Sequence, residues 1–278
     1  MFSVRFMDWL SILISVLIGL CSGAVTGLMG ASGVLIVVPA LTMSLNLPVH
    51  MAIGTSLAVD VIASIVVSYT YYRNKNVDLK SGVWLALGAV LGAQIGSIIA
   101  ANTPEFELGG VFSIFLILNG VGLWRREIRQ RLRLFTGASG KIKSEGETFV
   151  EIITLEKKKI AVTLLIGFMI GIVSGILGAG GGVMFLLVLI FVLKYPIHRA
   201  IGTSTLIMAI TAASGAIGYS LNGNINLIVA VIVGVGTILG GRVGAIYANR
   251  VTEETLAKIV GIIFMVLGMA MIITQLIQ

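Results

Sequence analysis

Residues 175–185 read GILGAGGGVMF, which places five glycines within eight residues of a long apolar stretch. Near-continuous hydrophobic sequence lies on both sides, where glycine is a poor helix former. A similar cluster, GLMGASG, occupies residues 27–33. The two clusters predict breaks between helices, at which the backbone is left without side chains.

The composition places the whole chain in a membrane. Of the 278 residues, 57% are hydrophobic and 11% are charged, and the mean hydropathy is +1.07, whereas about a quarter of the residues in soluble domains are charged. Apolar runs long enough to cross a bilayer core of about 30 Å recur along the chain. The single cysteine, Cys21, excludes a disulfide framework or a cysteine metal cluster. We expect no metal site and no cofactor.

The basic residues predict the orientation in the membrane. The stretch 125–159 holds ten of the 19 Lys and Arg together with five Glu. Because positively charged loops stay in the cytoplasm, we expect this loop on the cytoplasmic side of a bacterial or archaeal cell membrane. Contact with lipid headgroups is a second interpretation of the loop. A nucleic-acid partner is not expected, since no interleaved aromatic residues accompany the basic run.

The chain contains an internal repeat with an offset of 148 residues. The nonapeptide PVHMAIGTS at 48–56 matches PIHRAIGTS at 196–204, and glycines and asparagines match over about ninety positions without a gap. The sequence therefore predicts three parts, which are a first membrane repeat over 1–124, a basic cytoplasmic loop over 125–159 and a second membrane repeat over 160–278.

Each repeat contains five hydrophobic segments, and the second of them is short. The segments are expected at 9–28, 34–46, 51–72, 81–101 and 108–124, and at 160–177, 183–194, 199–220, 225–248 and 255–276. At 1.5 Å per residue, a segment of about a dozen residues covers roughly 20 Å and is expected to be a half-helix. An odd number of segments inserts the halves in opposite orientations. The predicted fold is an all-α integral membrane protein built as an inverted repeat.

The glycine clusters mark the N-terminal ends of the two half-helices. Such an end offers free N–H groups and the positive end of a helix dipole to an anion. We expect a small anionic substrate at the following residues: Gly30, Ala31, Ser32, Gly33, Gly178, Ala179, Gly180, Gly181 and Gly182. Close helix packing is the alternative, and we assign it to the glycines at four-residue spacing: Gly19, Gly23, Gly27, Gly88, Gly92, Gly96, Gly167, Gly171, Gly175, Gly236, Gly240 and Gly244.

The repeated IGTS tetrapeptide opens the third segment of each half. Candidate donors to a bound oxyanion are its hydroxyl groups, on Thr55, Ser56, Thr203 and Ser204. Helix capping and bonding to carbonyls of the same helix are equally open interpretations. His50 and His198 hold matching positions two residues after a proline, and both a gating role and a helix-entry role are open.

Two ionisable residues, Asp60 and Arg242, lie inside predicted spans. A charge at the bilayer centre costs about 2.5–3.5 kcal/mol on insertion scales. Asp60 is expected near mid-depth and is a candidate for coupling to H⁺ or Na⁺. Arg242 is expected about two turns from the cytoplasmic end, where snorkelling and a role in binding or gating are both open. Neither is duplicated, because Asp60 matches Met208 and Arg242 matches Gln94, which joins the coupling candidates.

These motifs resemble the sulfite exporter TauE/SafE family of membrane permeases. The resemblance rests on the duplicated glycine clusters, the GTS that opens the following helix, the pattern Y-x-x-x-x-N-[IV]-[DN]-L and the pattern G-x-x-x-G-x-x-x-G. It covers nearly the whole chain apart from the basic loop. The resemblance implies movement of small sulfur-containing anions, such as sulfite, thiosulfate or organosulfonates, across the cytoplasmic membrane.

The residues and the resemblance together predict a secondary transporter for a small anion, working by alternating access. No ATP-binding motif is present, and coupling to H⁺ or Na⁺ stays open. The alternatives are an anion channel with the same backbone-lined site and a transporter of carboxylates or other organic anions. An enzyme is not expected, because the sequence offers no converging nucleophile, base or metal ligands. The expected partners are the substrate and membrane lipids.

Overall fold

The computed structural model describes residues 9–30, 32–135, 157–178, 181–191, 193, 195–247 and 253–277. These residues form ten helices and no strand. In the first half they are α1 (Trp9–Met29), α2 (Val34–Leu45), α3 (Val49–Arg73), α4 (Leu79–Ala101) and α5 (Glu105–Phe135). In the second half they are α7 (Lys157–Leu177), α8 (Gly182–Phe191), α9 (Ile197–Leu221), α10 (Leu227–Tyr247) and α11 (Glu253–Ile277). The predicted all-α fold is confirmed.

Helix lengths match the expected spans with one exception. Seven helical stretches are long and apolar enough to cross a membrane, whereas α2 has 12 residues and α8 has 10. The fifth segment was expected to end at residue 124, but α5 continues to Phe135. The added stretch is rich in Arg and Leu, which are good helix formers, so the helix outlasts the apolar run.

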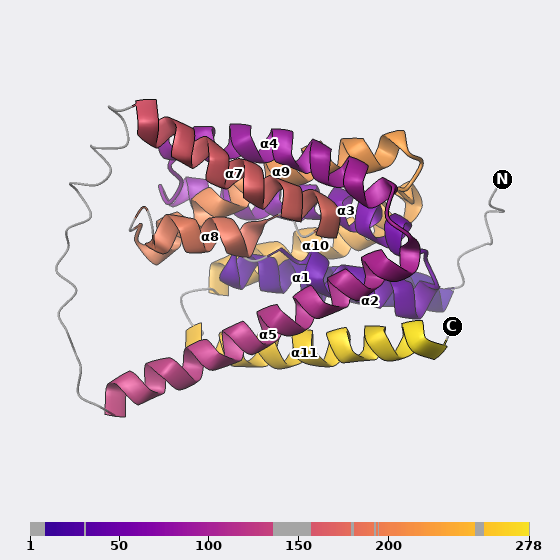
Figure 1. Ribbon diagram of the computed structural model, residues 1–278. Coiled ribbons are helices and arrows are strands. Elements are labelled where there is room, and N and C mark those ends of the chain that lie inside the picture. Colours follow the sequence, from indigo (N-terminus) through magenta and orange to yellow (C-terminus); the bar gives the residue numbers. More distant parts are fainter. Residues whose placement is uncertain are drawn as a thin grey trace.

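Helices of one half pack mainly against helices of the other. The principal pairs are α1 with α10, α4 with α7, α3 with α9, and α5 with α11. In the repeat, α1 corresponds to α7 and α4 corresponds to α10, so the α1–α10 pair is equivalent to the α7–α4 pair. The α3–α9 and α5–α11 pairs each join two equivalent helices. Figure 1 shows α5 and α11 side by side along one edge of the bundle.

Glycines bring two of these helix pairs into backbone contact. A Cβ atom at any of the twelve glycines spaced by four residues would lie within 2.5 Å of a carbonyl oxygen on the opposing helix. Gly19, Gly23 and Gly27 of α1 face α10, and Gly88, Gly92 and Gly96 of α4 face α7. The packing interpretation of these glycines is confirmed, because no side chain would fit at the contact.

The central helices α3 and α9 run in opposite directions. The Asn226 N–H, which follows α9, donates to Thr55 Oγ1 near the start of α3, at 2.9 Å. The Asp78 N–H, which follows α3, donates to Thr203 Oγ1 near the start of α9, also at 2.9 Å. Each half therefore docks the loop after its third helix on the first turns of the equivalent helix in the other half.

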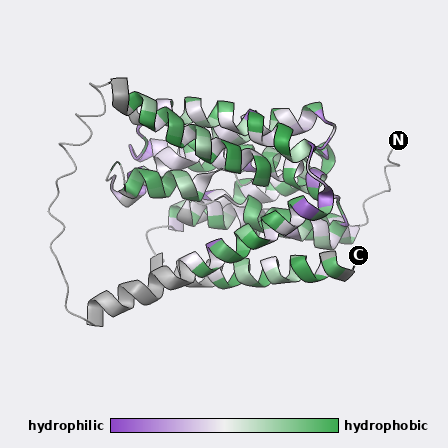
Figure 2. Ribbon diagram, viewed as in Figure 1, coloured by the Kyte–Doolittle hydropathy of each residue, from purple (hydrophilic) through white to green (hydrophobic). Residues whose placement is uncertain are grey.

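The outer surface of the bundle is apolar. Large hydrophobic side chains are exposed on several helices, among them Leu91 (62%), Leu165 (58%) and Val231 (61%). Figure 2 shows hydrophobic residues along the helices, with hydrophilic ones mainly in the turns. An exposed apolar surface of this extent is typical of contact with lipid.

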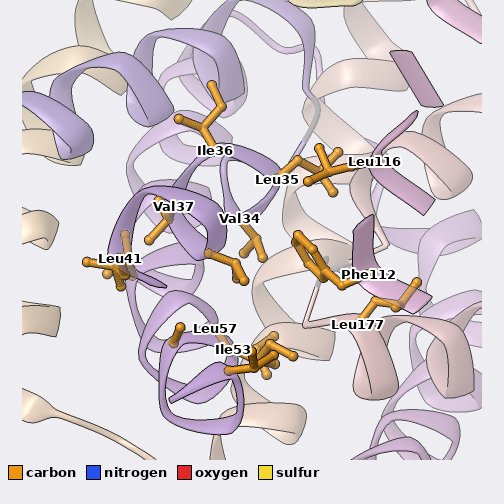
Figure 3. Packing of buried hydrophobic residues seen from close by; sticks show 14 of the residues in the cluster. Val34, Leu35, Ile36, Val37, Leu41, Ile53, Leu57, Phe112, Leu116 and Leu177 are labelled. Carbon is orange, nitrogen blue, oxygen red and sulfur yellow. The ribbon is translucent and has the colours of Figure 1, made fainter. Parts of the chain in front are cut away.

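The interior of the first half is packed around the short helix α2. Val34, Val37 and Leu41 of α2 are buried with Leu57 of α3 and Phe112 of α5. Figure 3 shows these side chains in one cluster. The half-helix therefore lies inside the protein rather than against lipid, which fixes the position of its N-terminus.

Candidate functional site

The two glycine bends meet inside the protein. A Cβ atom at Gly182, the first residue of α8, would lie 3.0 Å from the Gly30 carbonyl oxygen and 3.1 Å from the Ser32 backbone nitrogen. Met208 of α9 also lies against Gly182. Asp60, which contacts Ser32, and Met208 are each the twelfth residue of a 25-residue helix. The N-termini of α2 and α8 therefore face each other near the middle of α3 and α9.

Both bends are made by glycines in the left-handed conformation. Gly30 and Gly178 each have a φ of +65°, a region that other L-residues rarely adopt. A side chain at Gly30 would also meet Ile201, and one at Gly178 would meet Ile53. The glycines are required here by backbone conformation and by space, so the chain can turn from a full helix into a half-helix.

A cleft opens between the two bends, α5 and α7. Its empty volume is about 280 Å³, which includes space open to the surroundings, and it is lined by Ser32, Leu35, Phe115, Asn119, Val173, Ser174, Gly181, Val183 and Met184. Ser174 is 2% exposed, and its Oγ has no hydrogen-bond partner among the described residues. Buried hydroxyl groups normally have a partner, so this one is available to a ligand in the cleft.

The N-terminus of α2 is occupied by a carboxylate of the chain itself. Ser32 Oγ donates a 2.8 Å hydrogen bond to Asp60 Oδ2, and the carboxylate lies against the backbone N–H of Gly33. The Val34 N–H donates to Ser32 Oγ at 3.3 Å. A negative group is stabilised at a helix N-terminus, so the protein itself supplies the anion at this end.

At the N-terminus of α8, a methionine stands at the position equivalent to Asp60. Met208 and Gly180 hold the sequence positions that Asp60 and Ser32 hold in the first half. The Met208 thioether offers α8 neither a charge nor a strong acceptor. The two half-helix ends both follow a left-handed glycine, but they differ in chemistry and in backbone, since Gly33 has a φ of −68° and the equivalent Gly181 a φ of +73°.

The first N–H groups of α8 precede its hydrogen-bond ladder. Among the described residues, the first hydrogen bond along α8 is the one that the Phe185 N–H donates to the Gly181 carbonyl, at 2.9 Å. The N–H groups of Gly182, Val183 and Met184 come before it and have no acceptor within the helix. Val183 and Met184 also line the cleft, so an anion in the cleft would lie close to the positive end of α8.

A family model for the sulfite exporter TauE/SafE matches residues 15–271. The chain belongs to the TauE/SafE family. It is similar to two probable membrane transporter proteins of Bacillus subtilis: YunE, with 27% identity over 95% of this chain and 98% of the relative, and YdhB, with 28% identity over 84% and 89%. A probable membrane transporter protein of Methanocaldococcus jannaschii is 24% identical over 93% of this chain and 94% of its own. No solved structure matches. The TauE/SafE protein is therefore a multi-pass membrane protein of a transporter family.

The hydroxyl groups of the IGTS motifs in this TauE/SafE chain hold the fold together. Thr55 and Thr203 accept hydrogen bonds from the loop of the other half. Ser56 Oγ donates to the Ile53 carbonyl at 2.7 Å, and Ser204 Oγ donates to the Ile201 carbonyl at 3.0 Å. None of the four hydroxyl-bearing residues lines the cleft, so we do not include them in the site proposed below.

The remaining polar candidates are dispersed. His50 Nε2 lies 3.0 Å from the carbonyl oxygens of both Ala100 and Thr103, and therefore ties the start of α3 to the end of α4. His198 is the second residue of α9 and is partly buried. Arg242 is exposed on α10. None of the three lines the cleft.

Gln94 joins two helices of different halves. Its Nε2 donates to the carbonyl and hydroxyl oxygens of Ser214 on α9, at 2.6 and 3.0 Å. The Ser214 hydroxyl in turn donates to the Val90 carbonyl at 2.9 Å. Gln94 therefore fixes α4 against α9 and does not line the cleft. Ala31, Ala179 and Gly180, which were also predicted site residues, lie outside the described residues.

Two features of the structure were not predicted from the sequence. One is the docking of the Asn76 and Asn224 loops on Gly202 and Gly54, where a Cβ atom would collide with the asparagine carbonyl. The repetition of both motifs was the available signal. The other is an ion pair in which Arg199 donates to Asp78 at 2.8 Å. It had no sequence signal, because its residues are 121 positions apart.

Proposed function

We propose that this TauE/SafE protein is a secondary transporter of a small anion, with the substrate bound in the cleft at the N-terminus of α8. The observation that carries the proposal is the difference between the two half-helix ends. The α2 end has Asp60 and Ser32 against it, whereas the α8 end opens into a cleft that contains the unpartnered hydroxyl of Ser174.

The cleft has the chemistry that an oxyanion needs. The N–H groups of Gly182, Val183 and Met184 would donate to its oxygens, and the α8 dipole favours negative charge at this end. The Ser174 hydroxyl lies on the cleft wall, as does Asn119, whose Nδ2 donates to the Phe115 carbonyl at 2.8 Å. A sulfur oxyanion or an organosulfonate, which the family description suggests, presents several acceptor oxygens to such donors.

We further propose that the halves insert as an inverted repeat and rock against each other. The antiparallel α3 and α9, and the pairing of each half mainly with the other, support this arrangement. Substrate sites between inverted halves are common in secondary transporters. The basic loop after α5 would then face the cytoplasm, in a bacterial or archaeal cell membrane.

Uptake into liposomes tests the proposal. Purified protein is reconstituted and supplied with labelled sulfite, thiosulfate, sulfate, sulfoacetate or a carboxylate of similar size. We expect saturable uptake and counterflow of at least one sulfur-containing anion. Saturable carboxylate transport without sulfur-anion transport would identify the organic-anion alternative, and a non-saturating current without counterflow would identify a channel.

A variant at the half-helix end connects transport to the site. Gly182→Leu places a side chain against Met208 and between the two bends, and we expect it to abolish uptake. Gly110→Leu is the matched control, because a Cβ atom at Gly110 on α5 would have nothing within 4 Å. Both variants must elute as folded protein. Unchanged uptake by folded Gly182→Leu protein would refute the proposed site.

A further inference from the structure

Four polar side chains lie around the α2 bend without polar counterparts around the α8 bend. They are Ser22 of α1, Ser32 of the bend, and Asp60 and Ser64 of α3. At the repeat offset, their counterparts in the second half are Ile170, Gly180, Met208 and Ala212. All four positions are polar in the first half and lack a polar side chain in the second, although they come from three separate parts of each half.

Three oxygens of this cluster have no hydrogen-bond partner among the described residues. They are Ser22 Oγ, Asp60 Oδ1 and Ser64 Oγ. Ser22 and Asp60 are each 1% exposed and Ser64 is fully buried. A buried polar atom without a partner costs free energy, so three together indicate a ligand that takes oxygen atoms.

Ser22 and Asp60 both lie near Gly33, and Ser64 lies one turn further along α3. Ser22 Oγ is 2.6 Å from the position of a Cβ atom at Gly33, and the Gly33 N–H lies against the Asp60 carboxylate. Ser64 follows Asp60 by four residues and therefore lies one turn along on the same face of α3.

The charge of the cluster indicates the sign of its ligand. Asp60 is the acidic residue of the group, and no salt-bridge partner for it is found among the described residues. A carboxylate buried inside a membrane protein needs a cation or a proton to neutralise it, because the α2 dipole supplies only about half a positive charge. We propose that Asp60, Ser22 and Ser64 form a binding site for Na⁺, with Ser32 positioning the carboxylate.

The set of ligands favours a monovalent metal cation such as Na⁺ over H⁺, Ca²⁺ and Mg²⁺. A proton on Asp60 would leave the Ser22 and Ser64 hydroxyls without partners, whereas a hard cation binds several oxygens together. A single carboxylate is little charge for Ca²⁺ or Mg²⁺. Coupling ions of secondary transporters are bound near interrupted helices at the interface between repeats.

The site adjoins the cleft through Ser32, which both bonds to Asp60 and lines the cleft. Na⁺ would cancel the carboxylate charge that otherwise repels an anion nearby. Na⁺ would therefore favour anion binding, and this coupling rests on the proposed function, whereas Na⁺ binding itself does not.

Thermal unfolding of the purified full-length protein tests the site. The midpoint is measured in NaCl, KCl, LiCl and choline chloride at one pH and one ionic strength. We expect saturating Na⁺ to raise the midpoint by roughly 5 °C over choline. Asp60→Asn, which keeps the shape of the side chain, should abolish the rise, and Ser64→Ala should weaken the apparent Na⁺ affinity roughly fivefold.

The control is Ser68→Ala, one turn further along α3, whose hydroxyl donates to the Ile65 carbonyl at 3.1 Å. It should leave the sodium response unchanged. Absence of a sodium response in the wild type, or a full response in Asp60→Asn, would overturn the site. If Asp60→Asn does not fold, the serine variants decide. An unchanged sodium affinity in both Ser22→Ala and Ser64→Ala would then overturn the site. If the wild-type protein shows the sodium response but transports no anion, the transport proposal alone is refuted.

Discussion

At the scale of single residues, Asp60 and Met208 decide the difference between the two half-helix ends. They hold equivalent positions on α3 and α9, yet one brings a carboxylate to the α2 bend and the other a thioether to the α8 bend. A carboxylate at the α2 bend disfavours a second anion there, whereas the thioether at the α8 bend carries no charge. Ser174 of α7 lies in the wall of the cleft beside the α8 bend.

We expect Ser174→Ala to weaken the interaction with the substrate and to leave the fold intact. Loss of one hydroxyl donor to a charged ligand costs about 1.5–3 kcal/mol, which corresponds to a rise in KM of roughly ten- to hundredfold. The measurement is concentration-dependent uptake into liposomes.

Ser113→Ala is the control for this variant. Ser113 is also buried, but its hydroxyl donates to the Gly109 carbonyl of its own helix at 2.8 Å, and it does not line the cleft. An unchanged KM in Ser174→Ala, or an equal rise in Ser113→Ala, would exclude a direct contact of Ser174 with the anion.

At the scale of elements, two devices hold the halves together. Small residues allow α1 to approach α10 and α4 to approach α7 until backbones touch. The threonines of the IGTS motifs bind the loops that follow α3 and α9. The first device is a backbone contact between helices and the second is a hydrogen bond from a loop N–H to a side chain. Neither depends on a hydrophobic driving force, so both work in lipid.

Gly92→Val should separate α4 from α7. A Cβ atom at Gly92 would collide with the Phe168 carbonyl oxygen, which belongs to the backbone and has little freedom to move. We expect a loss of more than about 3 kcal/mol, seen as a poor yield of monodisperse protein and a lower unfolding midpoint. Gly110→Ala should leave both unchanged or raise the midpoint slightly, since alanine favours the helix. Equal behaviour of the two variants would contradict the packing role of Gly92.

Thr55→Val and Thr203→Val should each destabilise the protein by about 1–2 kcal/mol. Each removes the acceptor of a partly buried backbone N–H and leaves the shape of the side chain nearly unchanged. The unfolding midpoint should fall by roughly 2–6 °C for each, and the two losses should add, because the bonds lie at opposite ends of α3. Thr211→Val is the control, because the Thr211 hydroxyl bonds only within its own helix, to the Ile207 carbonyl. A loss in Thr211→Val as large as in the other two would remove the argument for loop docking.

At the scale of the whole molecule, the main helix contacts follow the internal repeat, because each contact has an equivalent when the two halves are interchanged. The pairs α1–α10 and α4–α7 are exchanged, and the antiparallel pair α3–α9 lies between them. Asn74 and Asn222 are equivalent residues that cap α3 and α9. Because these helices run in opposite directions, the two asparagines lie at opposite ends of the bundle.

Cysteine labelling of whole cells tests the resulting orientation. In a Cys21→Ala background, Asn222→Cys should react with a membrane-impermeant maleimide from outside, and Asn74→Cys should react only after permeabilisation. Both positions are exposed, so access depends on sidedness alone. Labelling of both from the same side would contradict the inverted insertion, and the reverse pattern would place the basic loop outside.

The sequence by itself determined the membrane class, the ten helices within a few residues, the duplication and the packing role of the spaced glycines. These features depend on hydropathy and on spacings along one chain, which are local properties. The end of α5 was missed because helix propensity continued after hydrophobicity stopped.

Only the tertiary structure decided the roles of the polar groups. The sequence treated both glycine bends as equivalent, and it left open whether the IGTS hydroxyls bind a ligand. Asp60 closes the α2 bend because Ser32, 28 residues away, is folded against it, and Thr55 is taken by a loop 171 residues away. Which hydrogen-bond partner a polar side chain finds depends on contacts between distant segments, and no local pattern specifies them.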